Sequence, residues 1–262
     1  MEKFGKSQSV LRTEDDRFLT GKGRYIDDAT PSDSLFAYFF RSQVAHAKIA
    51  SLNVVDAKKA VGIHGIFIAE DLENNGVKND LVGVTVKNRD GTDGASPKRP
   101  LLAKDRVRFV GEPIALVIAD TMQNAKDAAE LIEIDYDDLP VSTELKRGEY
   151  TIHPEAPENV AFEWQMGDES KTNELFEKAD KVVSMEVDNN RIIANSMEPR
   201  GCYAEWDNER LHISFSGQGV WAHKRFASEI LGLRSEQIRV TNPDVGGGFG
   251  MKAMGYPEEF VV

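Results

Sequence analysis

Two hydrophobic periods alternate along the first third of the chain. Residues 34–40 and 48–55 are rich in aromatic and β-branched side chains, a composition that favours strands. Residues 56–62 begin with Asp, end with Gly and predict a short helix, after which residues 63–68 return to a strand pattern. We interpret these segments as a compact β-α-β unit.

A second unit of the same kind follows. Residues 113–119 form a continuous apolar run, residues 121–131 an Ala-rich helical stretch, and residues 132–136 an alternating strand. That alternation fits a sheet covered on one face only. Between the two units, residues 74–99 are rich in Gly, Asn, Asp and Lys, which predicts a long exposed excursion.

Prolines and acidic residues interrupt the periodicity over residues 140–167, which we interpret as an extended linker. The pattern then predicts a helix over residues 172–178 and a strand over residues 182–187. A second β layer is expected within residues 203–215.

The last part of the chain ends in a glycine-rich loop. An amphipathic helix over residues 220–231, stopped by a Gly, leads to a strand at residues 238–240 and then to the run VGGGFGMK at residues 245–252. Three consecutive glycines leave a bend without Cβ atoms, so its backbone N–H groups can approach a ligand closely. Gln218 and Gly246–Gly250 fall at element ends, where ligand sites are usually built. Ordinary turn chemistry is the competing interpretation.

Known phosphate-binding motifs do not explain this loop. A P-loop requires Gly-Lys-Ser/Thr, whereas this chain has Gly250-Met251-Lys252-Ala253. A dinucleotide fingerprint requires an acidic residue about 20 positions further on, and only 12 residues follow Gly250. A plain nucleotide-binding domain is therefore the least favoured function.

Composition excludes several classes of partner. The chain has 262 residues, 40% of them hydrophobic, and a net charge of −12, which argues against nucleic acid or an anionic membrane as partner. No apolar run approaches the roughly 20 residues that a membrane span needs, and we expect a cytoplasmic protein. The single cysteine, Cys202, excludes a Cys-ligated iron–sulfur cluster within this chain. The five histidines are scattered, which argues against a protein-ligated metal site.

Several motifs occur together in a characteristic order. They are RFLTGKGRYIDD at 17–28, VGEPIA at 110–115, NSMEPRG at 195–201, SGQG at 216–219 and PDVGGGFGMK at 243–252. This order resembles the N-terminal portion of the molybdopterin-binding large subunit of the xanthine dehydrogenase and aldehyde oxidase family, in its carbon-monoxide-dehydrogenase-type branch. The resemblance implies an α+β fold. Residues 1–145 would form a small α/β hammerhead domain with an N-terminal extension, and residues 146–262 a linker and the incomplete beginning of a mixed α/β molybdopterin-binding domain.

The resemblance also implies roles for the loop residues in holding a molybdenum–molybdopterin cofactor. Gln218 stands where the family hydrogen-bonds a ligand of the molybdenum, and Phe249 and Gly250 where it presents backbone amides and an aromatic wall. Gly247 and Gly248 stand where the backbone approaches the pterin. No side chain of this chain is expected to ligate the metal, and the catalytic base is expected outside it.

Other chemistry-bearing residues have plainer interpretations. Arg200 either contacts a phosphate or pterin edge or pairs with Glu198. His212 alternates with apolar neighbours and is expected on the solvent face of a strand, and Cys202 is expected to be a small core residue. The carboxylates within residues 133–138 are expected to be a solvated strand face and turn.

The implied activity is that of an oxidoreductase, a molybdenum hydroxylase that oxidises an aldehyde, an N-heterocycle or carbon monoxide with water as the oxygen source. Ala253 stands where purine-hydroxylating members carry a glutamate, which disfavours a purine substrate. The expected partners are a second chain carrying the C-terminal half of the large subunit, iron–sulfur and FAD-containing flavin subunits, and a small-molecule substrate. The chain is expected to be a split-gene product or a truncation. The alternative is a non-catalytic assembly module or an inactive truncated subunit.

Overall fold

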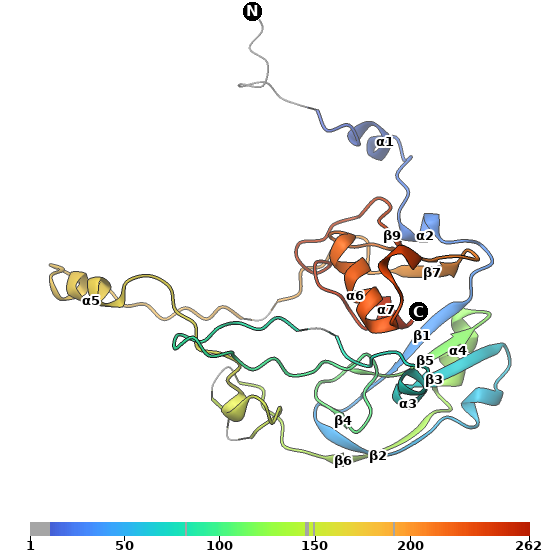
Figure 1. Ribbon diagram of the computed structural model, residues 1–262, viewed down its shortest axis with the longest axis horizontal. Helices are drawn as coiled ribbons and strands as arrows, with labels where there is room; N and C mark the ends of the chain where they lie inside the picture. The colour runs from blue at the N-terminus through green and yellow to red at the C-terminus, as the bar shows by residue number, and fades with distance from the viewer. Residues whose placement is uncertain (1–10, 82, 145–146, 149, 191) are drawn as a thin grey trace, which may run out of the picture.

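The computed structural model describes residues 11–262 apart from 82, 145–146, 149 and 191. Figure 1 shows two bodies packed together and an arm that projects away from them and carries α5 (Glu169–Glu177). Two sheets build the N-terminal body, and a third builds the C-terminal body. Ahead of the first strand, α1 (Asp15–Leu19) and α2 (Ile26–Ala29) lead past the C-terminal body.

The first sheet has the order β1-β5-β3, with both pairings antiparallel. The apolar run of β5 (Pro113–Ala119) is the central strand and is buried along almost its whole length, between β1 (Phe36–Arg41) and β3 (Ile63–Ile68). The helix α4 (Met122–Ala129) packs against this sheet through its alanines. Thr121 caps α4 by accepting a hydrogen bond from Asn124 N at 3.1 Å.

The second sheet has the order β4-β2-β6, again antiparallel, and it corrects the predicted β-α-β units. Its strands are β4 (Arg106–Val107), β2 (Ala47–Asn53) and β6 (Glu133–Asp138). The strands flanking each predicted helix therefore lie in different sheets, because β2 pairs with β6 while β3 pairs with β5. Periodicity identifies which side chains face a core but does not specify the partner strand.

Short elements and coil complete the N-terminal body. The predicted helix over 56–62 is a single 3-10 turn, η1 (Ala57–Lys59), and α3 (Ala69–Asn74) follows β3 directly. The excursion over 74–99 is confirmed as coil with two isolated bridges, Leu81 to Arg99 and Lys87 to Asp93. It is not exposed throughout, because Leu81 is buried in the main core.

The third sheet contains a parallel pair. Strands β7 (Cys202–Trp206) and β8 (Leu211–Phe215) are antiparallel, whereas β8 and β9 (Ile238–Thr241) are parallel and are connected by α6 (Trp221–Leu231). The predicted Gly stop of α6 is confirmed, since Gly232 has a φ of 67° in the left-handed region. Before β9, Ser235–Gln237 form the 3-10 turn η3.

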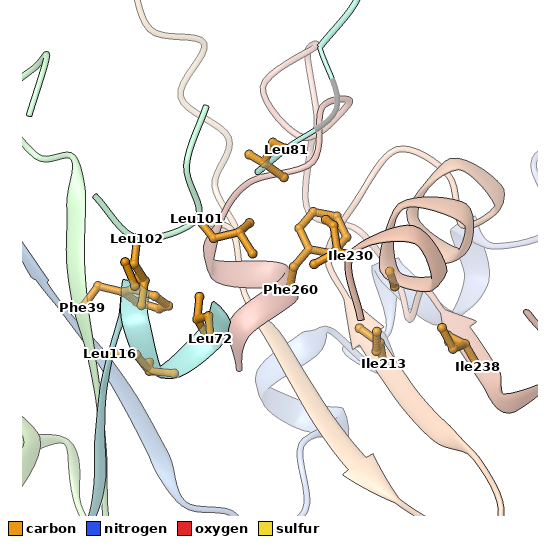
Figure 2. Packing of buried hydrophobic residues seen from close by; sticks show 12 residues of the cluster. Phe39, Leu72, Leu81, Leu101, Leu102, Leu116, Ile213, Ile230, Ile238 and Phe260 are labelled. Atoms are coloured by element: carbon orange, nitrogen blue, oxygen red, sulfur yellow. The ribbon is translucent and has the colours of Figure 1, made fainter. Parts of the chain in front are cut away.

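One hydrophobic core joins the two bodies. Figure 2 shows Phe39, Leu72 and Leu101 of the N-terminal body on one side, and Ile213 and Ile230 of the C-terminal body on the other, with Phe260 of α7 (Glu258–Val261) between them. A backbone hydrogen bond from Lys78 N to Ile230 O, 2.8 Å long, crosses the same boundary. The third sheet is therefore held in a fixed position against the N-terminal body.

The arm differs from the sequence prediction in one element. The predicted helix is confirmed as α5, capped by the side chain of Asp168, and a 3-10 turn, η2 (Pro157–Asn159), precedes it. The predicted strand over 182–187 is wrong, because these residues have no partner strand in the part of the chain that the structure describes. No helix in the described ranges is long and apolar enough to cross a membrane.

Candidate functional site

The glycine loop leaves β9 and turns sharply beside the β8–α6 connection. Gly247 and Gly250 have φ values of 103° and 84°, a region that L side chains rarely adopt. Phe249 lies between them with a φ of 51°, although it has a Cβ, at a cost of roughly 1–2 kcal/mol. Its ring is 77% exposed, so burial of the ring does not compensate for this strain.

Two glycines of the loop are required by close approach to neighbouring side chains. A Cβ on Gly246 would stand 2.5 Å from Cβ of Glu198, and one on Gly248 would stand 2.6 Å from Cδ of Gln218. Contacts this short do not occur in folded proteins, so a larger residue would displace the loop at Gly246 and the Gln218 side chain at Gly248. The sequence run of glycines thus reflects packing between the loop and both Glu198 and Gln218.

Gln218 forms hydrogen bonds to the C-terminal end of the loop, at Gly250 and Lys252. Its Oε1 accepts hydrogen bonds from Gly250 N at 2.9 Å and from Lys252 N at 3.3 Å, and its own N–H donates to Lys252 O at 3.0 Å. Because both groups that face the amide are donors, the amide oxygen must face them. The amide nitrogen of Gln218 is left to face away from the loop, with no acceptor among the described residues.

Three successive backbone donors in the loop have no partner. The N–H groups of Gly246 and Gly250 bond to Glu198 and Gln218, but those of Gly247, Gly248 and Phe249 make no hydrogen bond within the described residues. Backbone N–H groups clustered at a bend with positive φ values form a concavity that attracts anions and carbonyl oxygens. The loop and the Gln218 amide nitrogen therefore present a cluster of unpaired donors.

A buried ion pair holds the loop from behind. Nζ of Lys252 lies 2.8 Å from Oε2 of Glu198, and the Lys252 side chain is entirely buried. The same oxygen accepts the N–H of Gly246 at 2.8 Å, and Glu198 Oε1 accepts the N–H of Ile26 at 3.2 Å. Sequence reasoning missed this pair, because 54 residues separate its members and neither lies in a local charge pattern.

Arg200 makes different contacts from those expected. The predicted pairing with Glu198 is wrong, because Glu198 is engaged by Lys252. The Arg200 guanidinium lies 3.5 Å over the ring centroid of Tyr256, with Glu258 Oε2 3.9 Å away. The Tyr256 hydroxyl donates to Met251 O at 2.7 Å, so Arg200 supports the segment that follows the loop.

Residues 17–24 contact Asp244, which precedes the glycine loop. Asp244 forms an ion pair with Arg17 and accepts the N–H of Arg24 at 2.9 Å. The hydrogen bond from Arg17 and that from Arg24 lower the pKa of the Asp244 carboxyl. Two motifs far apart in the sequence thus meet at one side chain, a relationship that no local pattern reveals.

The C-terminal body contains a buried histidine. His223 of α6 stacks between Phe215 and Phe260, with ring centroids 3.9 and 4.6 Å away. Its Nε2 is 3.3 Å from Glu259 Oε2 but makes no hydrogen bond. Burial lowers the pKa of His223 to about 4 and raises the pKa of Glu259 to about 7.

The remaining candidates take structural roles. Burial raises the pKa of the Cys202 thiol to about 12, which is incompatible with a nucleophile at neutral pH. His212 lies on the face opposite the core, but it is not simply solvated, because its ring contacts Glu205 Oε1 at 3.0 Å and Thr241 Oγ1 at 2.9 Å. The carboxylates of β6 are exposed, as expected.

Comparison with known sequences assigns the family. Residues 20–140 match the a/b hammerhead domain of aldehyde oxidase and xanthine dehydrogenase, and residues 152–262 match the molybdopterin cofactor-binding domain. The chain belongs to the aldehyde oxidase and xanthine dehydrogenase family. Within this family it corresponds to the N-terminal portion of the large subunit, and the α+β fold expected from the sequence is confirmed.

Individual members of the family cover nearly all of this chain. The nicotine 6-hydroxylase large subunit of Paenarthrobacter nicotinovorans is 36% identical over 261 residues, which are 97% of this chain and 31% of that protein. The carbon monoxide dehydrogenase large chain of Afipia carboxidovorans is 31% identical, over 94% of this chain and 31% of its own. The crystal structure of a Cu,Mo-CO dehydrogenase superposes with a TM-score of 0.82 at 29% identity, covering 97% of this chain and 33% of that one. The chain thus spans about a third of the length of these relatives.

All of the predicted site residues fall inside the matched cofactor-binding domain of this family member. Gln218 and the loop residues Gly247, Gly248, Phe249 and Gly250 lie together at one end of the third sheet. Gly250 uses its N–H for Gln218, so the free donors are those of the three preceding residues. Lys252 and Glu198, which sequence reasoning did not select, fix the position of the loop.

Proposed function

We propose that this chain is the cofactor-binding portion of the large subunit of a molybdenum hydroxylase. The observation that carries the proposal is the set of unpaired donors at Gly247, Gly248 and Phe249, which lies in the domain that matches the molybdopterin cofactor-binding family. A bend with three successive unpaired N–H groups favours a ligand rich in oxygen acceptors. The phosphate, the pterin carbonyl and the metal-bound oxygens of molybdopterin are such acceptors.

The residues present fit this group. Gln218 would donate from its amide nitrogen to an oxygen ligand of the molybdenum, since its amide oxygen is held by the loop. The backbone of Gly247 and Gly248 would contact the pterin, where the absence of Cβ atoms permits close approach. Phe249 and Gly250 would line the metal side, Phe249 with an exposed ring and Gly250 with open space where a Cβ would stand.

Bound molybdopterin would supply the redox chemistry that transfers an oxygen atom from water to the substrate and accepts two electrons. This chain would bind and orient the cofactor, and the general base would come from outside it. The substrate is an aldehyde, an N-heterocycle or carbon monoxide. Relatives named for nicotine hydroxylation and for carbon monoxide, xanthine and aldehyde oxidation support this range.

We further propose that the chain works within an assembly. Matched relatives are named as a large subunit, a large chain and a complex subunit gamma, which supports a multi-subunit enzyme. The remaining part of the large subunit would complete the cofactor site. Iron–sulfur and FAD-containing subunits would remove the electrons, because this chain has a single cysteine and cannot ligate a cluster through cysteine alone.

Metal and pterin analysis tests this function. We expect the chain, purified from its native host with its copurifying partners, to contain about one molybdenum and one pterin per chain. Gly248→Ala should abolish most of this content, because its Cβ would displace Gln218. Gly76→Ala is the control, since a Cβ on Gly76 would meet nothing within 4 Å, and the positive φ of Gly76 adds a backbone strain that Gly248 does not have. An assembled complex free of molybdenum would instead favour the non-catalytic assembly module.

A further inference from the structure

The arm exposes many large apolar side chains. It leaves the N-terminal body after β6, carries α5 at its far end and enters the C-terminal body at β7 (Figure 1). Every residue of α5 is exposed, so the helix has no core of its own. The exposed apolar residues of the arm are Phe162, Trp164, Met166, Leu175, Phe176, Val182, Val183, Met185, Val187, Ile192, Ile193 and Met197. Exposed apolar side chains that lie together mark an interaction site, and Phe176, Val182 and Val183 lie together because they line one hollow.

The segment by which the arm returns, residues 182–187, has the sequence pattern of a half-buried β-strand although it forms no strand in the structure. Val183, Met185 and Val187 fall on one face, and they are 90%, 82% and 68% exposed. Ser184 and Glu186 fall on the other face. This period of two is the reason that the sequence predicts a strand here, and it places three apolar side chains where a partner would cover them.

The backbone of this segment has unused hydrogen-bonding capacity. Between residues 181 and 190 no N–H or C=O group bonds to another described residue. Unpaired main-chain groups along an extended segment form a template onto which another strand can add. Next to it, Leu175, Phe176 and Val182 line a mainly apolar hollow of about 330 Å³, which has room for a large apolar side chain.

We propose that residues 181–188 are a docking strand for a β-strand from the part of the large subunit that this chain does not contain. The chain spans about a third of its relatives' length, yet the arm lies inside the region that matches the cofactor-binding domain. We therefore take the remainder of that subunit as the polypeptide that covers this surface. The added strand would carry apolar side chains at alternate positions and cover Val183, Met185 and Val187. This inference rests on the proposed function, because it takes its partner from the family's large subunit.

Hydrogen exchange on the 262-residue chain provides the test. The probe is the unmatched two thirds of the nicotine 6-hydroxylase large subunit, expressed as a separate polypeptide. In the free chain we expect the amides of residues 181–188 to exchange at the rate of an unstructured peptide. In the complex we expect every second amide to exchange at least about 100-fold more slowly, because ladder hydrogen bonds protect alternate N–H groups.

A matched pair of variants distinguishes specific binding at this surface from nonspecific hydrophobic binding elsewhere on the chain. Val183→Asp places a charge on the apolar face and should weaken binding of the probe by at least about tenfold. Val61→Asp should leave binding unchanged, because Val61 is 88% exposed but lies in the N-terminal body. Both sites are exposed, so both variants should keep the far-ultraviolet circular dichroism of the parent.

Molybdenum content, measured on the same complex, distinguishes this inference from the proposed function. Protected amides at 181–188 without molybdenum would support the docking strand and contradict the function. Molybdenum without protection there would overturn the docking strand and leave the function intact. The proposal is also overturned if no complex with the probe forms, or if the free chain dimerises through Val183 and already protects these amides.

Discussion

Lys252 and Glu198 form a buried ion pair in which Nζ and Oε2 are 2.8 Å apart, and the same carboxylate oxygen also receives the N–H of Gly246. One side chain thereby neutralises a buried ammonium group and fixes the entry to the glycine loop. The pair is central to the position of the candidate site although neither residue faces a ligand.

Replacing Glu198 should be strongly destabilising. Glu198→Ala leaves the Lys252 charge buried without a partner, so we expect the free energy of unfolding to fall by about 3–5 kcal/mol in urea denaturation. Lys252→Met in the same background should restore part of the loss, because the unpaired charge is gone. Asp56→Ala, which breaks the exposed Lys59–Asp56 pair, should cost less than about 1 kcal/mol. Equal effects of Glu198→Ala and Asp56→Ala would contradict the structural role.

Phe249 is strained in the absence of ligand. Asn tolerates the left-handed region, and the Phe249 ring is largely exposed, so Phe249→Asn should raise the free energy of unfolding by up to about 1 kcal/mol. The same variant should lower retention of molybdopterin, because the aromatic wall is lost. Phe109→Asn, at an exposed phenylalanine outside the left-handed region, should give no gain in stability. Destabilisation by Phe249→Asn would show that the ring makes a favourable contact that outweighs the strain.

His223 and Glu259 should make opposite contributions to the pH dependence of the free energy of unfolding, and replacing either residue should expose the contribution of the other. The pKa of His223 falls from 6.5 to about 4 on folding. Its contribution to the free energy of unfolding is therefore present above pH 6.5 and is lost as the pH falls toward 4. The pKa of Glu259 rises from 4.5 to about 7 on folding. Its contribution to the free energy of unfolding is therefore present below pH 4.5 and is lost as the pH rises through 7. Between pH 4.5 and 6.5 the two slopes cancel in the parent protein.

Single substitutions should reveal the two slopes of the free energy of unfolding against pH, which cancel in the parent protein. In Glu259→Gln the free energy of unfolding should fall by about 3 kcal/mol between pH 6.5 and 4, since the 2.5 pKa units of His223 correspond to about that free energy and no longer have an opposing slope. His223→Gln should instead make stability fall by a similar amount as the pH rises from 4.5 to 7. Denaturation curves at four pH values measure both slopes, and a parallel pH profile in all three proteins would refute the assignment.

Cys202 should be unreactive in the folded chain. Burial holds the pKa of its thiol near 12, so almost no thiolate exists at pH 8. We expect iodoacetamide at this pH to leave the native protein unmodified and to add one carbamidomethyl group in 6 M urea, because the chain has one cysteine. Mass spectrometry measures both, and rapid labelling of the native protein would contradict the burial of Cys202.

Much of the secondary structure follows from local patterns. The apolar run at 113–119, the Thr-capped helix after it and the Gly232 stop of α6 all have causes that act within a few residues. The run of three glycines likewise marks the loop without any knowledge of the fold. The strand pattern at 182–187 was misleading, because a strand needs a partner and the described residues provide none.

The sequence by itself determined the loop, its flexible backbone and the order of motifs that identifies the family, because glycine conformations and hydrophobic periods are local properties. Only the tertiary structure decided which strands pair, that Lys252 rather than Arg200 neutralises Glu198, and that Arg17 reaches Asp244. Those relationships join residues up to 227 positions apart. Their partners are selected by the packing of the sheets and of the shared core, which no local pattern of residues encodes.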